Sequence, residues 1–399
     1  MKKEASMQDV FKKAAKKFDT PLYLYSENII LSKINEVFKT FKGIDFHPTF
    51  ALKANSNPNL LKIMRDKGFG SDVVSSGELR ASIMAGVDLK SIVWNGCGKS
   101  RAEMAEFLSA GIGKVNIDSI EEIALWREAL KSSKHRPEFF VRINSEVDAL
   151  THPFIATGLK KHKFGIPVKL LVNFFETAKK AGIKISGFHS HIGSQVTDVT
   201  PYFDAFSQIT AMAEEYGIKK INIGGGWGID YTGDKLNLAE YRKKVVPLFK
   251  NFEITAEFGR FIVAEAGFYL VTVQITKYNG YKYFIVANGG MNHLLRPALY
   301  SAIHDFEVIG KMNNKFEASY NIVGPLCESG DVLYTNRDGG LPEPGSVIVF
   351  KNTGAYGYAM ASNYNGTVRP AEVLITSGGE LKLIRKRETL ADLFAGVIM

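Results

Sequence analysis

The sequence contains only two cysteines in 399 residues, Cys97 and Cys327. Two cysteines cannot form a disulfide framework, and we expect both thiols to stay reduced in the cytoplasm. No stretch of about 18 consecutive apolar residues occurs, so we predict no membrane span. The amphipathic, Lys-rich start at Met1–Lys17 has no apolar signal core, which argues against export.

Metal-binding motifs are also scarce. His189 and His191 lie on one face of a predicted strand as a candidate metal pair, but there is no HExxH motif and no clustered third ligand, so we predict no metal. Fifty Lys and Arg against 41 Asp and Glu give a net charge of +9. The basic residues are spread as short pairs without an aromatic stripe, which argues against nucleic acid. A solvated basic surface would instead attract an anionic cofactor or substrate.

Short apolar runs alternate with amphipathic segments between residues 46 and 257. The predicted strands are Phe46–Leu52, Ser71–Val74, Ile92–Trp94, Val115–Ile117, Phe139–Ile143, Ile185–His189, Lys220–Ile223 and Ile254–Ala256. The predicted helices are Asn59–Lys67, Gly77–Ala85, Arg101–Ala110, Ser119–Leu130, Val168–Ala181, Pro201–Tyr216 and Leu238–Lys250. Eight strands separated by seven helices predict an α/β fold, a (β/α)8 barrel of the TIM type. A doubly wound open sheet shares this alternation and is the alternative.

The pattern changes after Gly259, where strands follow one another with little helix. The predicted strands are Phe268–Thr276, Tyr281–Ala287, Ser319–Val323, Val347–Phe350, Glu372–Thr376 and Leu381–Ile384. They indicate a second, mostly antiparallel β domain, which Leu22–Tyr25 could join. We expect the barrel at 26–265 and the β domain at 1–25 with 266–399. The segment Asn144–Gly165 has no clear periodicity, and a loop of that length is often functional.

In barrels of this kind the active site lies at the carboxyl ends of the strands. The positions at these ends are Lys53, Asp72, Asn95, Asp118, Arg142, His191, Gly224–Gly226 and Glu257. Most are polar or charged, which loops would also explain. Lys53 closes an apolar run, so we expect partial burial, which lowers the pKa of the amine and favours attack on a carbonyl carbon. From its position alone, a plain surface lysine remains the competing interpretation.

Two further patterns follow predicted strands. The glycine-rich run Ile223–Gly228 lets backbone N–H groups approach a phosphate, although a tight turn would need the same glycines. Glu257 could keep a pyridine nitrogen protonated, whereas an ion pair with Arg260 is the structural alternative. His191 could stack on a planar cofactor, and Ser194 could add a hydroxyl to a phosphate.

The β domain has three segments of interest, each ordinary by itself. Arg296–Tyr300 offers a carboxylate-binding guanidinium beside a phenol. Gly324–Asp331 carries Cys327 beside two carboxylates in a turn-rich loop, although a lone cysteine is most often a small buried hydrophobe. Gly354–Tyr358 carries aromatic hydroxyls in a glycine-flanked loop.

Together these segments resemble one known family. The motifs, in chain order, are FALKAN, DVVSSGEL, NGCGKS, RINSEVDALTHPFIATGLKKHKFGI, HSHIGSQ, INIGGGWGIDY, EFGR, RPALY, GPLCESGD, GAYGYAMASNYN and RPAEV. They are similar to those of the fold-type III pyridoxal-phosphate decarboxylases from Pro21 to the last residues. The resemblance implies an alanine racemase-like fold, the cofactor pyridoxal 5'-phosphate, and a homodimer with shared active sites.

The resemblance also implies residue roles. Lys53 would carry the cofactor, His191 would stack on its ring, Glu257 would pair with its nitrogen, and Cys327 would protonate the carbanion left by CO2. The implied phosphate contacts are Ser194, Gly224, Gly225, Gly226 and Tyr356. The cofactor site would be completed by Asp72, Gly259 and Arg260. The implied substrate contacts are Arg260, Arg296, Tyr300, Glu328 and Tyr356.

The implied reaction is decarboxylation of meso-2,6-diaminopimelate to L-lysine, whose distal amine and carboxylate would need an anion beside a cation. Carboxynorspermidine, ornithine and arginine are the alternative substrates. An ornithine site meets only an amine distally, where two arginines would be superfluous. An alanine racemase would need a second base, usually tyrosine. A catalytically inactive relative would be expected to lack Lys53 or Cys327, and both are present.

Overall fold

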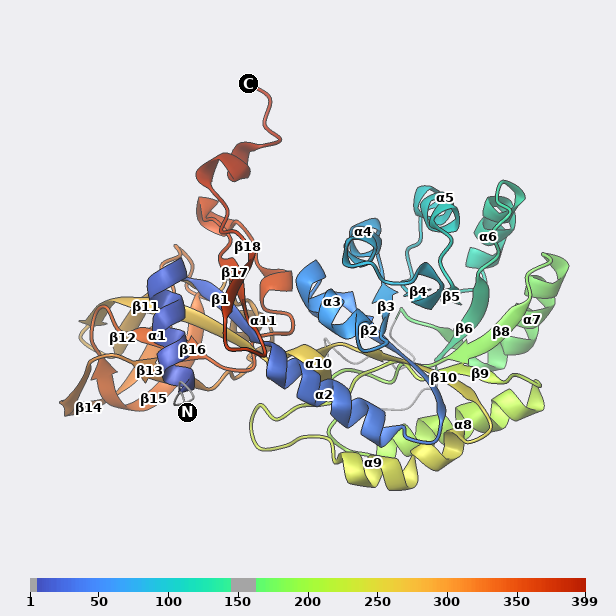
Figure 1. Cartoon of the computed structure of the whole chain (residues 1–399), viewed down its shortest axis with the longest axis horizontal. Helices are drawn as coiled ribbons and strands as arrows, with labels where there is room; N and C mark the ends of the chain where they lie inside the picture. Colours follow the sequence, from blue (N-terminus) through green and yellow to red (C-terminus); the bar gives the residue numbers. More distant parts are fainter. Residues whose placement is uncertain (1–5, 145–162) are drawn as a thin grey trace. The chain divides into compact units, whose positions relative to one another are not determined.

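The computed structural model describes residues 6–144 and 163–399. The chain divides into two compact units, one formed by Met1–Ile30 with Val263–Met399 and the other by Leu31–Ile262 (Figure 1). The division falls within helices α2 (Glu27–Thr40) and α10 (Arg260–Val263), close to the expected boundaries at 25/26 and 265/266. Residues 145–162, most of the predicted functional loop, lie outside the described residues.

The unit Leu31–Ile262 is a closed parallel barrel. Its strands are β2 (Asp45–Ala51), β3 (Gly70–Val73), β4 (Ile92–Trp94), β5 (Lys114–Ile117), β6 (Glu138–Asn144), β8 (Ile185–His189), β9 (Lys220–Asn222) and β10 (Glu253–Phe258). β2 pairs with β3 and β10, and β5 pairs with β6, so the eight strands close on themselves. The barrel prediction is therefore confirmed, and the open sheet is excluded. A two-residue strand, β7 (Ile166–Pro167), adds to β6.

Helices surround the barrel, and their ends follow local sequence chemistry. They are α3 (Pro58–Arg65), α4 (Ser76–Ala85), α5 (Arg101–Ala110), α6 (Glu122–Lys131), α7 (Leu171–Lys180), α8 (Thr200–Glu215) and α9 (Leu238–Lys244). At the start of α5, Ser100 and Glu103 form a reciprocal capping box, and Gly111 ends the helix with φ +82°. Only glycine adopts that conformation without strain. Helix α2 was not predicted from the sequence.

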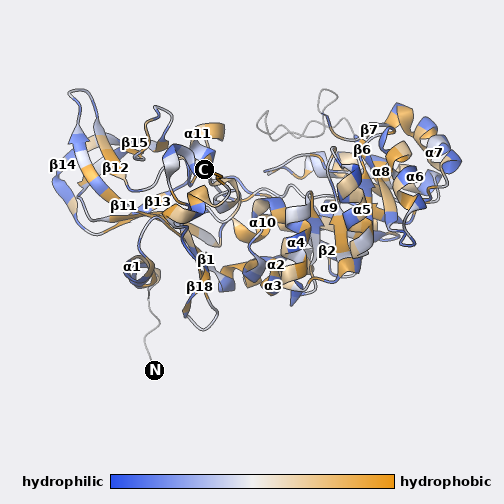
Figure 2. Cartoon of the chain, turned by 90° about the horizontal axis from the view of Figure 1, so that it is seen from above, coloured by the Kyte–Doolittle hydropathy of each residue, from blue (hydrophilic) through white to orange (hydrophobic). Residues whose placement is uncertain are grey.

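Aromatic side chains fill the space between strands and helices. The rings of Trp94 on β4 and Phe107 on α5 stack with centroids 3.9 Å apart, and Trp126 on α6 meets Trp94 edge-on at 5.7 Å. Each buried aromatic contributes roughly 1.5–3 kcal/mol through burial. Figure 2 shows the helices in alternating hydrophobic and hydrophilic bands, as amphipathic helices against a buried sheet require.

The second unit is a nine-stranded sheet. Its strands are β1 (Leu22–Ser26), β11 (Gly267–Tyr278), β12 (Tyr283–Ala287), β13 (Phe306–Ile309), β14 (Met312–Val323), β15 (Val332–Pro342), β16 (Val347–Phe350), β17 (Ala371–Ile375) and β18 (Leu381–Arg385). Most pairs are antiparallel; β1–β17 and β12–β14 are parallel. Helix α1 (Met7–Phe18) buries Phe11 and Ala14 against the core. The mostly antiparallel domain and the joining of β1 are confirmed, while β13 and β15 were not predicted.

No helix among the described residues is long and apolar enough to cross a bilayer.

Candidate active site

A polar network centred on Glu257 fills the carboxyl ends of the barrel strands. Oε1 of Glu257 on β10 accepts from Nδ2 of Asn95 at 2.7 Å and from Nδ2 of Asn222 at 2.7 Å. Nδ2 of Asn116 lies 3.4 Å and Nε2 of His189 3.5 Å from the same oxygen. Asn95 also donates to Oδ1 of Asp72 at 2.6 Å. Four other strands, β4, β5, β8 and β9, thus bring polar side chains to one buried carboxylate, because parallel strands end at the same edge.

The two carboxyl groups of this network have opposite pKa shifts. Burial raises the pKa of Asp72 well above its usual value, and the neighbouring Glu257 charge raises it further. Burial also acts to raise the pKa of Glu257, but contacts with His189 and Asn95 outweigh it and hold that pKa below the usual value. Burial lowers the pKa of His189, and the nearby Glu257 carboxylate opposes this shift. Glu257 is therefore the ionised member of the pair.

The His191 ring is fixed by the glycine-rich loop. Nδ1 of His191 accepts the backbone N–H of Gly225 at 3.1 Å. A ring nitrogen that accepts is unprotonated, so the neutral ring carries its hydrogen on Nε2. Burial lowers the pKa of His191 well below its usual value, and the Lys53 charge lowers it further. The ring is therefore neutral near pH 7 and has one defined orientation.

The three consecutive glycines of the loop, Gly224 to Gly226, cannot be replaced without a clash. A Cβ on Gly224 would lie 2.6 Å from the Ser190 carbonyl oxygen, and one on Gly225 2.0 Å from that of Glu257. A Cβ on Gly226 would lie 2.2 Å from the Gly193 carbonyl oxygen. Contacts below 3.0 Å require the backbone to move, so this loop needs glycine for close approach. The Gly224 N–H donates to Oδ1 of Asn222 at 3.0 Å.

A second loop, 190–196, is tied to the glycine-rich loop. The Val196 N–H donates to the Gly226 carbonyl at 2.9 Å, and the Gly228 N–H donates to the Val196 carbonyl at 3.0 Å. Gln195 donates to the Ile229 carbonyl at 2.6 Å and accepts its N–H at 3.3 Å. These hydrogen bonds join the two loops and so position His191 relative to the glycines.

Arg260 is the first residue of α10, separated from β10 by Gly259, and is almost fully buried. Its guanidinium donates to Oγ of Ser194 at 3.0 Å and to the hydroxyl of Tyr231 at 3.2 Å. The alternative of a Glu257–Arg260 ion pair is wrong, because the carboxylate is held by amides instead.

Lys53 lies in a one-turn 3-10 helix, Leu52–Ala54, directly after β2. Its neighbours in the turn are buried, but Lys53 itself is exposed, so the expected partial burial is wrong for this chain. The run of apolar residues ends one position before the lysine, whose charge still acts on Asp72 and His191. Gly259 packs on this turn, since a Cβ there would lie 3.1 Å from that of Ala54.

In the β unit, the loop carrying Cys327 and Glu328 is organised by Asp331. Asp331 is buried and accepts the N–H groups of Met291 at 2.6 Å and Leu326 at 2.8 Å. Cys327 and Glu328 are exposed, and the Cys327 N–H donates to Oδ1 of Asn365 at 2.9 Å. Asp331 thus shapes the loop, a role that the sequence did not indicate.

Arg296 begins the short helix α11 (Arg296–Tyr300) and is buried. Its Nη1 donates to Nε2 of His304 at 2.8 Å, and Nδ1 of His304 donates to the Lys351 carbonyl at 3.0 Å. His304 therefore orients the guanidinium, which sequence reasoning missed. Tyr300 is partly buried at the other end of the helix.

Tyr356, also partly buried, has φ +58°. A bulky residue in this left-handed region is strained and is found where the surroundings impose it, often at functional sites. The following Gly357 allows the tight fold, since a Cβ there would lie 2.4 Å from the Thr353 carbonyl oxygen.

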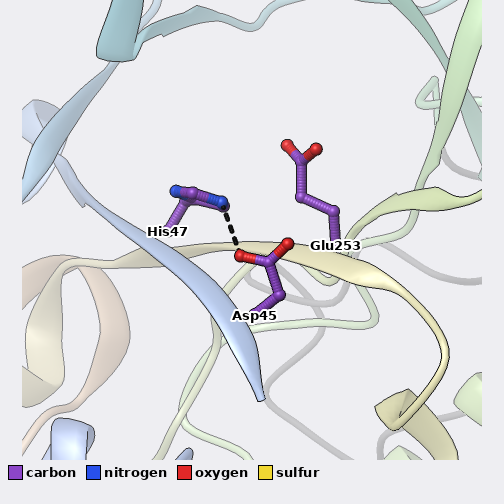
Figure 3. A group of neighbouring side chains, drawn as sticks. All are labelled: Asp45, His47 and Glu253. Atoms are coloured by element: carbon purple, nitrogen blue, oxygen red, sulfur yellow. Dashed lines mark ion pairs between the residues drawn. The ribbon is translucent and has the colours of Figure 1, made fainter.

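A third group of side chains lies at the opposite, amino end of the barrel. Figure 3 shows Asp45, His47 and Glu253, whose candidate ligand atoms all lie within 4.8 Å of one another. Both oxygens of Glu253 already meet lysines, Oε1 with Lys114 at 3.3 Å and Oε2 with Lys220 at 3.2 Å. A metal ion would have to displace these cations, so we interpret the group as an ion-pair network.

Comparison with known proteins identifies the family. Residues 28–271 match the family described as pyridoxal-dependent decarboxylase, pyridoxal binding domain. Diaminopimelate decarboxylase of Aquifex aeolicus is 37% identical over 388 residues, 94% of this chain and 91% of the relative. That of Neisseria meningitidis serogroup B is 38% identical over 395 residues, 96% of this chain and 94% of the relative.

Solved structures agree. Diaminopimelate decarboxylase of Helicobacter pylori complexed with L-lysine has a TM-score of 0.90 at 33% identity, covering 96% of this chain and 98% of that one. A lysine/ornithine decarboxylase of Vibrio vulnificus complexed with cadaverine has a TM-score of 0.80 at 21% identity, covering 92% and 97%; at that identity the likeness shows the fold alone.

The residues at the barrel mouth fit the family's cofactor, pyridoxal 5'-phosphate. Glu257 is a buried, ionised carboxylate suited to a protonated ring nitrogen, and His191 is a neutral aromatic ring held in one orientation. The glycine loop leaves no room for side chains, as a phosphate cradle requires. With the match over most of its length, the chain belongs to the diaminopimelate decarboxylases of the pyridoxal-dependent decarboxylase family.

Proposed function

We propose that this chain decarboxylates meso-2,6-diaminopimelate to L-lysine and CO2, the last step of lysine biosynthesis, with pyridoxal 5'-phosphate as cofactor. One structural observation carries the chemistry: Glu257 is a buried carboxylate at the carboxyl end of the barrel whose Oε1 accepts hydrogen bonds from the amides of Asn95 and Asn222. The substrate is supported by full-length relatives with this activity in their names and by the relative that binds L-lysine.

Pyridoxal 5'-phosphate supplies a pyridinium ring that accepts the electron pair left behind when CO2 departs. Glu257 would hold the proton on the ring nitrogen, and its low pKa keeps the carboxylate charged for this task. His191 would pack its neutral ring against the cofactor and exclude water from one side. Lys53 would bind the cofactor through its amine.

The phosphate would be bound by Ser194, the glycine-rich loop and Tyr356. Because the N–H groups of Gly224 and Gly225 donate to Asn222 and His191, the loop contact would fall to Gly226 and to the residues after it.

The distal end of the substrate carries an amine and a carboxylate. Glu328 would bind the amine, while Arg260 and Arg296 supply guanidinium groups for carboxylates. Tyr300 and Tyr356 would add hydroxyl contacts. Cys327 would donate the proton to Cα after CO2 leaves, a role that suits its exposed thiol.

We also propose a homodimer in which the loop of Cys327 and Glu328 reaches the partner's site. Its support is the exposure of both residues and of apolar side chains near the end of the chain, Leu390 and Phe394. In this proposal residues 26–265 bind the cofactor, while 1–25 and 266–399 supply substrate and dimer contacts. A cytoplasmic location suits the two free thiols.

Three measurements test these proposals. Purified protein with added cofactor is assayed for CO2 release from meso-diaminopimelate, carboxynorspermidine, ornithine and arginine. Turnover only of meso-diaminopimelate is expected, and no turnover of it rejects the substrate. Mixing Lys53→Ala with Cys327→Ala chains should restore part of the activity if sites are shared; no recovery would argue for self-contained subunits. Cell fractionation tests the cytoplasmic location.

A further inference from the structure

The four contacts to the Glu257 side chain converge on a single oxygen. The amides of Asn95, Asn116 and Asn222 donate to Oε1, and Nε2 of His189 lies 3.5 Å from the same oxygen. None of the contacts that this carboxylate makes with the described residues uses Oε2. The two shortest come from amides, both at 2.7 Å, on strand β9 and directly after strand β4.

Asn222 joins this carboxylate to the glycine-rich loop. Its Nδ2 donates to Glu257, while its Oδ1 accepts the N–H of Gly224 at 3.0 Å. The side chain is almost completely buried, with 1% of its surface exposed. Both ends of the amide are therefore used, and the position of the carboxylate is linked to that of the loop.

We propose that Asn95 and Asn222 are positioning residues that saturate Oε1 of Glu257 and so present Oε2 to the ring nitrogen of pyridoxal phosphate. This inference rests on the proposed role of Glu257. Asn222 further sets the distance between that carboxylate and the glycine-rich loop. The contacts to the cofactor ring and to its phosphate are thereby positioned relative to each other.

The chemistry of the donors explains why amides serve here. A cationic partner such as arginine would neutralise the carboxylate and weaken its hold on a protonated ring nitrogen. Amides orient the Glu257 carboxylate and stabilise its ionised form without neutralising its charge. Asn95 also donates to Asp72, so the same amide separates the ionised carboxylate from the acid with the raised pKa.

The test compares two cofactors that differ in one ring atom. Apoprotein is titrated with pyridoxal 5'-phosphate and with its 1-deaza analogue, in which C–H replaces the ring nitrogen, and the dissociation constants are measured by fluorescence. For Asn222→Ala and Asn95→Ala, affinity for pyridoxal phosphate should fall about tenfold more than affinity for the analogue, the effect of one lost hydrogen bond to a charged group. Equal losses would overturn the proposal, because a merely structural amide supports both ligands alike.

Asn288→Ala is the matched control. Asn288 lies in the other unit and also uses both ends of its amide, accepting from the Thr272 N–H at 2.9 Å and donating to the Thr20 carbonyl at 2.9 Å. It should reduce stability without changing the ratio of the two affinities. A similar ratio change in this variant would remove the support for a specific role.

Asn222→Asp keeps the shape of the side chain and guards against simple misfolding. The introduced carboxyl can donate to Glu257 only while protonated, and a second carboxylate at that distance raises its pKa. Affinity for pyridoxal phosphate should therefore fall with rising pH more steeply than in the wild type; parallel profiles would contradict the proposal. Glu257→Gln tests the role of Glu257 separately from that of the two asparagines. If this variant still binds pyridoxal phosphate more tightly than the 1-deaza analogue to the same extent as the wild type, the proposed role of Glu257 is wrong. If the wild-type protein does not turn over diaminopimelate but still prefers pyridoxal phosphate to the analogue, only the proposed substrate is rejected.

Discussion

The N–H of Gly225 donates to Nδ1 of His191 at 3.1 Å, so a backbone amide of the glycine-rich loop fixes the tautomer of the ring. The same loop supplies the Gly224 N–H to Asn222, which holds Glu257. The loop therefore orients both side chains proposed to contact the cofactor ring, in addition to any contact with phosphate.

Replacing Gly225 should disrupt cofactor binding. In Gly225→Ala the added Cβ would lie 2.0 Å from the Glu257 carbonyl oxygen, so the loop must shift and His191 loses its donor. We expect at least a tenfold loss of affinity for pyridoxal phosphate, measured by equilibrium dialysis. Gly77→Ala is the control, because its Cβ meets only Oγ of Ser75 at 3.8 Å; wild-type affinity in Gly225→Ala would contradict the assignment.

Cys327→Ala should separate chemistry from binding. The variant keeps the Cys327 backbone contact to Asn365, so the loop should stay ordered and the cofactor should bind normally. Loss of the proton donor is expected to reduce kcat by about 10²–10⁴-fold. Cys97→Ala, at the other exposed cysteine, should retain activity. Full activity of Cys327→Ala would show that another group donates the proton.

The buried pair Lys99–Glu122 should contribute strongly to barrel stability. Nζ of Lys99 donates to Oε1 of Glu122 at 2.9 Å and to the Asn116 carbonyl at 2.8 Å, and its side chain is 1% exposed. Lys99→Met leaves a carboxylate buried without its cation, which costs about 3–5 kcal/mol in urea unfolding.

Two further variants check this interpretation. Lys99→Met combined with Glu122→Leu should recover part of the loss, because no buried charge remains. Lys131→Met, at the exposed pair Lys131–Glu128, should leave stability unchanged. A double variant as unstable as the single one would show that packing, rather than charge, is responsible.

The β unit should lose stability in mild acid because of His293. Burial lowers the pKa of His293 from 6.5 to about 4. Between these values the unfolded chain binds a proton that the folded chain does not, so the contribution is complete above pH 6.5 and is lost as pH falls toward 4. The loss amounts to about 3 kcal/mol. In His293→Gln, the urea unfolding midpoint should depend less on pH between pH 7 and pH 4 than in the wild type. If the pH dependence of the midpoint is unchanged, His293 is not its cause.

The barrel could be predicted from the sequence because its signals are local. Strand β4 and helix α5 have the predicted bounds, since an apolar run and a capping box with a terminal glycine define them. Helix α2 and strands β13 and β15 were missed, because their burial depends on neighbours distant in the chain. Lys53 was expected to be partly buried, but it is exposed. The apolar run before it does not reveal the turn that follows.

The residue types at the strand ends, and with them the fold and the family, could be identified from the order of amino acids, since alternating patterns and ordered motifs are properties of the chain. Which of these groups meet depends on the folded barrel. Asn222 has no distinguishing feature in the sequence, yet barrel closure brings β9 beside β10 and its amide to 2.7 Å from Glu257. Ionisation follows from such contacts, because burial and hydrogen bonds from distant strands, rather than residue identity, separate the pKa of Glu257 from that of Asp72.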